Sequence, residues 1–328
     1  MNVILPLAPP LIESYLHHLY QTAIICNNNK TAPWLLSNYI QIYYDGNELA
    51  PVQFYLPDET GYTWSPLCPW LETQILNKNT IANLNIDIID FIKQSISDGY
   101  YFVTYINEKY IPGKISYEKK EDFSHMFLIN GYNKEKQTLN HLGYNNKVLS
   151  QTEISFSNFR QAYYSNRNYP YYTHDKIYLM KINNNFNYEF NLTHVFNQLK
   201  DLIHSRRQDK FNNDPNHLFG YNVYSNLLNI MDKEVQEYQE INIIPFLLLS
   251  EHKKLMKMRI DYMIKQGFID NGKRFQNDFE DIEKKFIILR NKALKYNFSK
   301  DINEVIDIKK EVEKYQYIEM ELIHKIIL

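Results

Sequence analysis

The chain has 328 residues, of which 44% are hydrophobic and 23% are charged, a composition typical of one large globular domain or two of ordinary size. The formal net charge is −2 and no long basic block occurs, so the charge pattern gives no indication of binding to nucleic acid or to an anionic membrane. Two cysteines are too few for a disulfide framework, no apolar run is long enough to span a membrane, and the first residues lack the basic region of a signal peptide, so we expect a cytoplasmic protein.

The first predicted helix lies in the segment APPLIESYLHHLYQTAII, residues 8–25, and begins near Ser14 after two prolines. Several enzyme families carry their nucleophile on the first turn of such a helix. The positive end of the helix dipole and the free N–H groups there lower the pKa of a thiol and can stabilise an oxyanion. Ser14 also fits a plain N-cap, because serine is a favoured capping residue.

The elements that follow are predicted from hydrophobic spacing and turn residues. Residues 45–70 are rich in proline, aspartate, glycine and aromatic residues and predict an irregular loop region. Residues 81–100 have apolar positions at helical spacing, and Gly99 ends that helix. Runs rich in β-branched and aromatic residues predict strands at 100–111, 125–133, 137–145 and 176–183.

The second half of the chain has a different pattern. Apolar residues recur at helical spacing in segments 192–207, 221–238, 246–268, 278–297 and 302–328. The fold class we expect is therefore α+β, with an N-terminal domain over residues 1–185 and a C-terminal helical domain over residues 186–328.

His125 opens one of the predicted strands, in the segment HMFLINGYN. This position places an imidazole at the rim of a sheet, with its ring supported by packed neighbours. Thiol hydrolases hold their general base in this way, with the nucleophile presented by a helix N-terminus.

The segments SDGYYFVTYINEKYIPG and HMFLINGYN, together with a first helix that has a nucleophile position, resemble the papain-like, C39-peptidase-like acyltransferases of bacterial secondary-metabolite clusters. The butirosin-pathway acyltransferase family and the closthioamide-pathway amide synthetase type are of this kind. The resemblance covers residues 5–185 and implies a papain-like cysteine-protease fold. It also implies that an acyl group passes from a carrier-protein thioester to a catalytic cysteine and then to a small amine.

The resemblance implies specific residues and partners. The family cysteine falls at Ser14, the base is His125, and Asn140 is the candidate by residue type for the third member on the next strand. The acyl donor would sit on the phosphopantetheine arm of an acyl or peptidyl carrier protein, with no metal and no diffusible cofactor. No glutamine stands upstream of Ser14 to complete a papain-type oxyanion hole, which is a departure from the pattern.

The serine at this position leaves several interpretations open. In the first, a catalytic cysteine has been replaced by serine, and in the second, Ser14 is a natural serine nucleophile. In the third, the protein is a non-catalytic homologue that binds a pathway metabolite, as an immunity or binding protein would. Natural serine catalysis is the least favoured, because a serine hydroxyl is un-ionised at neutral pH and needs a well-aligned base. A cysteine-type peptidase acting on a leader peptide is a further alternative.

Other candidate residues have simpler interpretations. Cys26 is the rival nucleophile, but it lies near the C-terminal end of the first helix, where the dipole disfavours a thiolate, and we expect it to be a small buried apolar residue. Cys68 lies between prolines and is expected to pack in a loop. Glu13 and His17 are spaced i, i+4 and could bind a metal, but one pair of ligands is weak evidence. We expect Glu13, His17 and His18 to lie on a solvated face.

Overall fold

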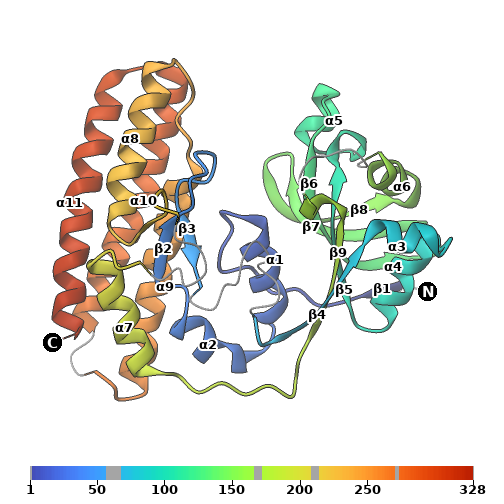
Figure 1. Cartoon of the computed structure of the whole chain (residues 1–328), viewed down its shortest axis with the longest axis horizontal. Coiled ribbons are helices and arrows are strands. Elements are labelled where there is room, and N and C mark those ends of the chain that lie inside the picture. The colour runs from blue at the N-terminus through green and yellow to red at the C-terminus, as the bar shows by residue number, and fades with distance from the viewer. Residues whose placement is uncertain (1, 57–67, 166–171, 208–213, 270–272, 328) are drawn as a thin grey trace. The chain divides into compact units, whose positions relative to one another are not determined.

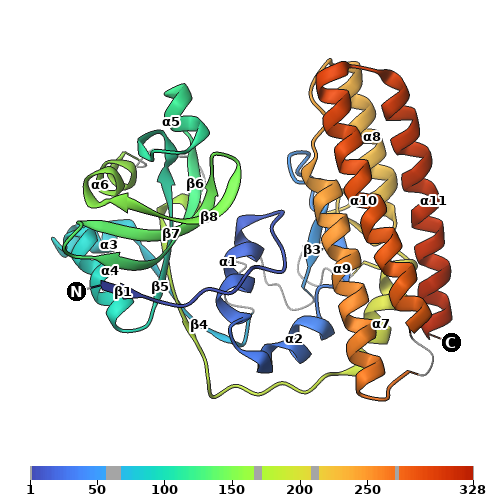
Figure 2. The same ribbon diagram turned by 180° about the vertical axis from the view of Figure 1, so that it is seen from behind.

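The computed structural model describes residues 2–56, 68–165, 172–207, 214–269 and 273–327. The chain forms two compact units (Figures 1 and 2). Unit 1 consists of Met1–Leu11, Tyr15–Asn29 and Trp64–Phe186, and unit 2 consists of Ile12–Ser14, Lys30–Thr63 and Asn187–Leu328. We predicted a division after residue 185; the units divide after Phe186, and unit 2 also takes two segments of the N-terminal part.

Unit 1 contains an antiparallel sheet with the strand order β4-β9-β5-β6-β7-β8, and β1 also pairs with β6. The strands are β1 (Asn2–Ile4), β4 (Leu71–Asn77), β5 (Tyr101–Asn107), β6 (Ser124–Asn133), β7 (Thr138–Asn145), β8 (Val148–Ser155) and β9 (Lys176–Ile182). The predicted strands correspond to β5, β6, β7 and β9 and are confirmed. The sequence did not predict β4 and β8, which stand at the two ends of the strand order. Both strands contain many exposed polar residues and have no continuous apolar run.

The helices of unit 1 are α1 (Leu16–Ile25), α3 (Lys78–Asn83), α4 (Ile88–Ser97), α5 (Ile115–Lys119) and α6 (Phe156–Tyr164), with short 3-10 turns η3 (Glu108–Tyr110) and η4 (Tyr172–Asp175). The single helix predicted over residues 81–100 is wrong, because the segment divides into α3 and α4. Asn85 adopts a left-handed conformation with φ of 52°, and Asp87 then caps α4 by accepting hydrogen bonds from the N–H groups of Ile89 and Asp90. Gly99 follows the end of α4 with φ of +86°, as a helix-ending glycine does.

The core of unit 1 lies where α4 and α6 pack on the sheet. Apolar side chains from the two helices meet those of the central strands β5 and β6, and Figure 1 shows both helices beside these strands. The buried members include Ile89, Ile92, Ile96, Phe102, Ile106, Phe127, Ile129, Phe159 and Tyr163. This packing fixes the ends of β5 and β6, which carry the candidate site.

The first helix begins two residues later than predicted. Its first residue is Leu16, and the N-cap position is Tyr15, which makes no side-chain capping hydrogen bond. The interpretation of Ser14 as the N-cap is therefore wrong, and Ser14 precedes the helix by two positions.

Unit 2 combines a small sheet with a set of long helices. Its elements are α2 (Ala32–Ser37), β2 (Gln41–Tyr44), β3 (Gln53–Tyr55), α7 (Leu192–Ile203), β10 (Leu218–Phe219), α8 (Asn222–Gln236), α9 (Ile244–Lys265), α10 (Lys273–Ser299) and α11 (Ile302–Ile327). The helices predicted for the second half are confirmed, and α9, α10 and α11 run side by side in both views (Figures 1 and 2). The loop predicted for residues 45–70 contains β3, and β4 begins directly after it at Leu71. Its part 57–67 lies outside the described residues.

Unit 2 also buries an ion pair between two of these helices. The Nζ of Lys253, on α9, lies 2.6 Å from both carboxylate oxygens of Glu319, on α11, and both side chains are 0% exposed. Lys253 also donates to the hydroxyl of Tyr224 at 2.7 Å, and this hydroxyl donates to Glu319 at 3.0 Å. The ring of His252 completes the cluster, because its Nε2–H donates to the carbonyl of Ile40 and its Nδ1 accepts from Lys253 at 3.0 Å.

Candidate functional site

His125 is the second residue of β6 and pairs with Ile106 of β5. Its side chain is 39% exposed, and its ring centroid lies 5.1 Å from that of Phe123. The predicted position of His125 at a strand start, with a packed aromatic neighbour, is thus observed in the structure. Its role as a base remains a prediction.

The partner of the imidazole is Glu108, which the sequence analysis missed. Nδ1 of His125 lies 3.1 Å from Oε1 of Glu108. Strand β5 ends at Asn107, whose side chain accepts from the N–H of Lys109 and turns the chain into η3. Because β5 and β6 are antiparallel neighbours, the end of one strand meets the start of the other. An acidic residue directly after β5 was the signal that could have identified this partner.

Lys114 completes the charged group around Glu108. Its Nζ lies 3.6 Å from Oε1 of Glu108 and donates to the carbonyl of Tyr144 at 2.7 Å. Burial would raise the pKa of Glu108, but the hydrogen bond and charge of His125 and the charge of Lys114 outweigh it and lower that pKa. Burial lowers the pKa of Lys114, and Glu108 opposes that change. Glu108 is therefore held as a carboxylate that accepts Nδ1–H, which leaves the lone pair of His125 on Nε2.

His125 lines a cavity of about 330 Å³, which we call the His125 pocket. Its lining is mainly apolar and includes Leu16 and Tyr20 of α1, Glu108, Lys114, Phe123, His125 and Tyr144. Leu16 is the first residue of α1, so the start of this helix and the imidazole line the same pocket within unit 1. An apolar cavity with a few convergent polar groups and a charged cluster is the usual form of a small-molecule site.

Asn140 lies on β7, opposite Gly131 of β6 and Glu153 of β8. The hydrogen-bond partner described for the His125 ring is the carboxylate of Glu108 and not this amide. The geometry therefore assigns the orienting position to Glu108, and a role for Asn140 stays a prediction from residue type alone.

Ser14 belongs to unit 2, where it contacts Glu251 of α9. The carboxylate of Glu251 accepts the backbone N–H of Glu13 at 2.6 Å and that of Ser14 at 3.2 Å. In a papain-type site, the N–H of the nucleophile would face the oxyanion of the reaction. In this chain, the N–H of Ser14 already donates to the carboxylate of Glu251. Because His125 belongs to unit 1, the pairing of Ser14 with His125 rests on the sequence alone.

The buried Glu251 carboxyl gives unit 2 a pH-dependent stability. Burial raises its pKa from 4.5 to about 7, and the nearby charge of Glu13 also raises it. The hydrogen bonds from the N–H groups of Glu13 and Ser14 lower this pKa, but by less. A pKa that is higher in the folded state means that protonation favours folding, so this contribution is complete below about pH 4.5 and is lost as the pH rises through about 7. The contribution amounts to about 3 kcal/mol.

We expect Glu251→Gln to remove this dependence, because the amide stays neutral and still offers an oxygen to the two N–H groups. Urea unfolding of the variant and the unchanged chain, followed by circular dichroism between pH 4.5 and 8.5, measures the difference. The gap between their free energies of unfolding should grow in favour of the variant as the pH rises. Two curves that stay parallel over this range would contradict the assignment.

The structure describes the positions of the two cysteines and of the histidines of α1. Cys26 is the C-cap residue of α1, and Cys68 is 1% exposed with a thiol whose pKa burial raises to about 12. The packing expected for Cys68 is observed, whereas Cys26 is only partly buried. The solvated face expected for the histidines is wrong for His18, which is 1% exposed; burial also lowers the pKa of His17 to about 4.

Comparisons with protein-family models and with curated proteins find no match to this chain. Within the described ranges, no helix is both long and apolar enough to cross a membrane. In the same part of the chain, no group of three or more His, Cys, Asp or Glu side chains is placed to hold a metal ion.

Proposed function

We propose that the chain is a papain-like acyltransferase in which His125 of unit 1 is the general base and acid and Glu108 holds its ring. The observation that carries the proposal is the 3.1 Å contact of His125 Nδ1 with Glu108 at the wall of a mainly apolar pocket that the start of α1 also lines. A mixed fold with an antiparallel sheet and a helical second unit is consistent with it.

The proposed reaction has two half-steps. Nε2 of His125 takes the proton of the nucleophile, which the sequence resemblance assigns to position 14, as the nucleophile attacks the carbonyl carbon of a thioester, and returns it to the departing pantetheine thiol. A small amine then attacks the carbonyl carbon of the acyl-enzyme, and His125 accepts the proton that the amine loses. The amide forms as the bond to the enzyme nucleophile breaks, and His125 returns this proton to the nucleophile. The imidazolium that exists between these transfers is stabilised by the Glu108 carboxylate. The donor would be an acyl or peptidyl carrier protein, whose pantetheine arm suits a mainly apolar pocket.

A second candidate function is supported by Glu251. Its carboxylate accepts the N–H of Ser14, the group that an oxyanion would need, and residue 14 is a serine. Both features fit a non-catalytic homologue that binds a pathway metabolite.

Product analysis distinguishes the two functions. The chain and its Ser14→Cys variant are incubated with a panel of acyl-pantetheine thioesters and small amines, and amide products are measured by liquid chromatography with mass spectrometry. We expect amide formation by the Ser14→Cys variant and its loss in Ser14→Cys/His125→Ala. If no version forms an amide while a pathway metabolite raises the melting temperature, the acyl-transfer proposal is abandoned for the binding function.

A further inference from the structure

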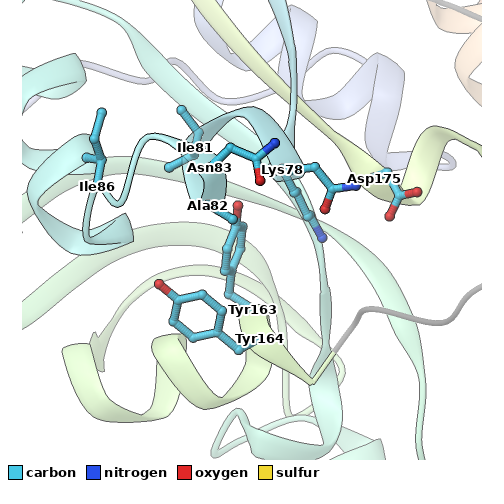
Figure 3. A pocket seen from close by; sticks show the side chains of 9 residues that line it. Lys78, Ile81, Ala82, Asn83, Ile86, Tyr163, Tyr164 and Asp175 are labelled. Atoms are coloured by element: carbon cyan, nitrogen blue, oxygen red, sulfur yellow. The ribbon is translucent and has the colours of Figure 1, made fainter.

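Another cavity of unit 1, of about 410 Å³, lies between α3, the end of α6 and the turn η4 (Figure 3). We call it the Lys78 pocket. Its lining consists of Lys78, Asn79, Ile81, Ala82, Asn83, Ile86, Tyr163, Tyr164 and Asp175. The volume is at the lower end of the range of about 300–1,000 Å³ for ligand sites, so it suits a small molecule.

The amine of Lys78 stands in the wall of this pocket. Its Nζ donates to the backbone carbonyl of Tyr105 at 2.5 Å and lies 5.0 Å from the centre of the Tyr163 ring. Burial lowers the pKa of Lys78 to about 7, although the carboxylate of Asp175 acts in the opposite direction. A large fraction of this amine is therefore neutral at pH 7 and has a free electron pair, whereas an ordinary lysine is neutral to roughly one part in 10³.

The other polar groups indicate what kind of molecule the pocket accepts. Asn79 and Asn83 offer amides, the tyrosines offer hydroxyls, and Asp175 offers a carboxylate that would repel an acid. Figure 3 shows Lys78, Asn83 and Asp175 along one side and the rings of Tyr163 and Tyr164 on the other. Such a lining matches the hydroxyl groups of a small, uncharged and hydroxylated molecule.

We propose that the Lys78 pocket binds a small hydroxylated aldehyde or ketone and that Nζ of Lys78 joins its carbonyl carbon as a reversible imine. The electron pair of Nζ attacks the carbonyl carbon, and the carbonyl oxygen takes up a proton. The carbinolamine then loses this oxygen as water, and the second N–H proton leaves as the C=N bond forms. No oxidant or reductant takes part, and the step does not depend on acyl transfer at His125.

The test uses glyceraldehyde with sodium cyanoborohydride at pH 7, which converts an imine to a stable secondary amine. Peptide mapping by mass spectrometry gives the labelling rate of each lysine on the unchanged protein. The control is Lys136, which is 62% exposed and pairs with Glu153 on the surface. We expect Lys78 to react at least about tenfold faster than Lys136, because much more of its amine is neutral.

The concentration dependence separates a binding site from a merely reactive amine. The labelling rate of Lys78 should saturate as glyceraldehyde is raised, while that of Lys136 should rise linearly. Lys78→Met should remove the fast phase and Lys136→Met should leave it unchanged. A Lys78 that reacts no faster than Lys136, or whose rate never saturates, would overturn the proposal, and this result needs no variant to fold.

Discussion

Replacing Lys253 by alanine is expected to lower the free energy of unfolding by about 3–5 kcal/mol. The substitution removes the only cation described within hydrogen-bond distance of the Glu319 carboxylate and leaves that charge 0% exposed. The Tyr224 hydroxyl, which also donates to Glu319, cannot replace a cation. Chemical unfolding monitored by the helical circular dichroism signal measures the loss.

Two further variants show whether the effect comes from the buried charge. Lys253→Met/Glu319→Leu removes both charges and keeps most of the volume, so it should recover most of the loss. Lys257→Ala, on the same helix, breaks a contact with Glu280 in which both side chains are about a third exposed, and it should cost far less. Equal losses for Lys253→Ala and Lys257→Ala would show that the buried pair does not have the energetic role assigned to it.

In the Ser14→Cys background, Glu108→Ala is expected to slow acyl transfer by about 10²–10⁴-fold. The carboxylate accepts Nδ1–H of His125, so its loss frees the ring to rotate and to place its proton on Nε2, where it cannot act as a base. Rates of amide formation measure the effect. The tautomer of His125, read from nitrogen chemical shifts, should change in the same variant.

Glu118→Ala is the matched control for that variant. Glu118 lies on α5, ten residues after Glu108, and its side chain is exposed. We expect its substitution to leave both the rate and the tautomer unchanged. If Glu108→Ala transfers acyl groups as fast as this control, Glu108 does not position the base.

The sequence predicted the central strands and the long helices because their side chains are buried in a regular period. Strand β6 is buried on both faces, and its apolar run identified it together with the position of His125. Strand β8 consists mostly of exposed or half-buried residues, with Ile154 buried, and it pairs with β7 along its whole length. Local pattern is a poor guide to such strands, because few of their side chains are buried and their pairing depends on a neighbouring strand.

Some residues of the candidate site could also be predicted from the sequence, and others could not. Glu108 could have been predicted, because it directly follows one strand of an antiparallel pair whose other strand begins beside His125. Glu251 could not, because 237 residues separate it from Ser14. The burial of Lys253 could not be predicted either, because nothing in the sequence distinguishes it from Lys254 and Lys257. Its burial depends on its contact with Glu319 of α11.

The most direct test of the proposed acyl transfer is the rate at which the Ser14→Cys chain gains an acyl mass from an acyl-pantetheine thioester, with the adduct mapped to its residue. We expect the adduct at position 14, and we expect His125→Ala to slow its formation by about 10²-fold or more. An adduct found only on Cys26 or Cys68, or one that forms equally fast without His125, would contradict the proposal.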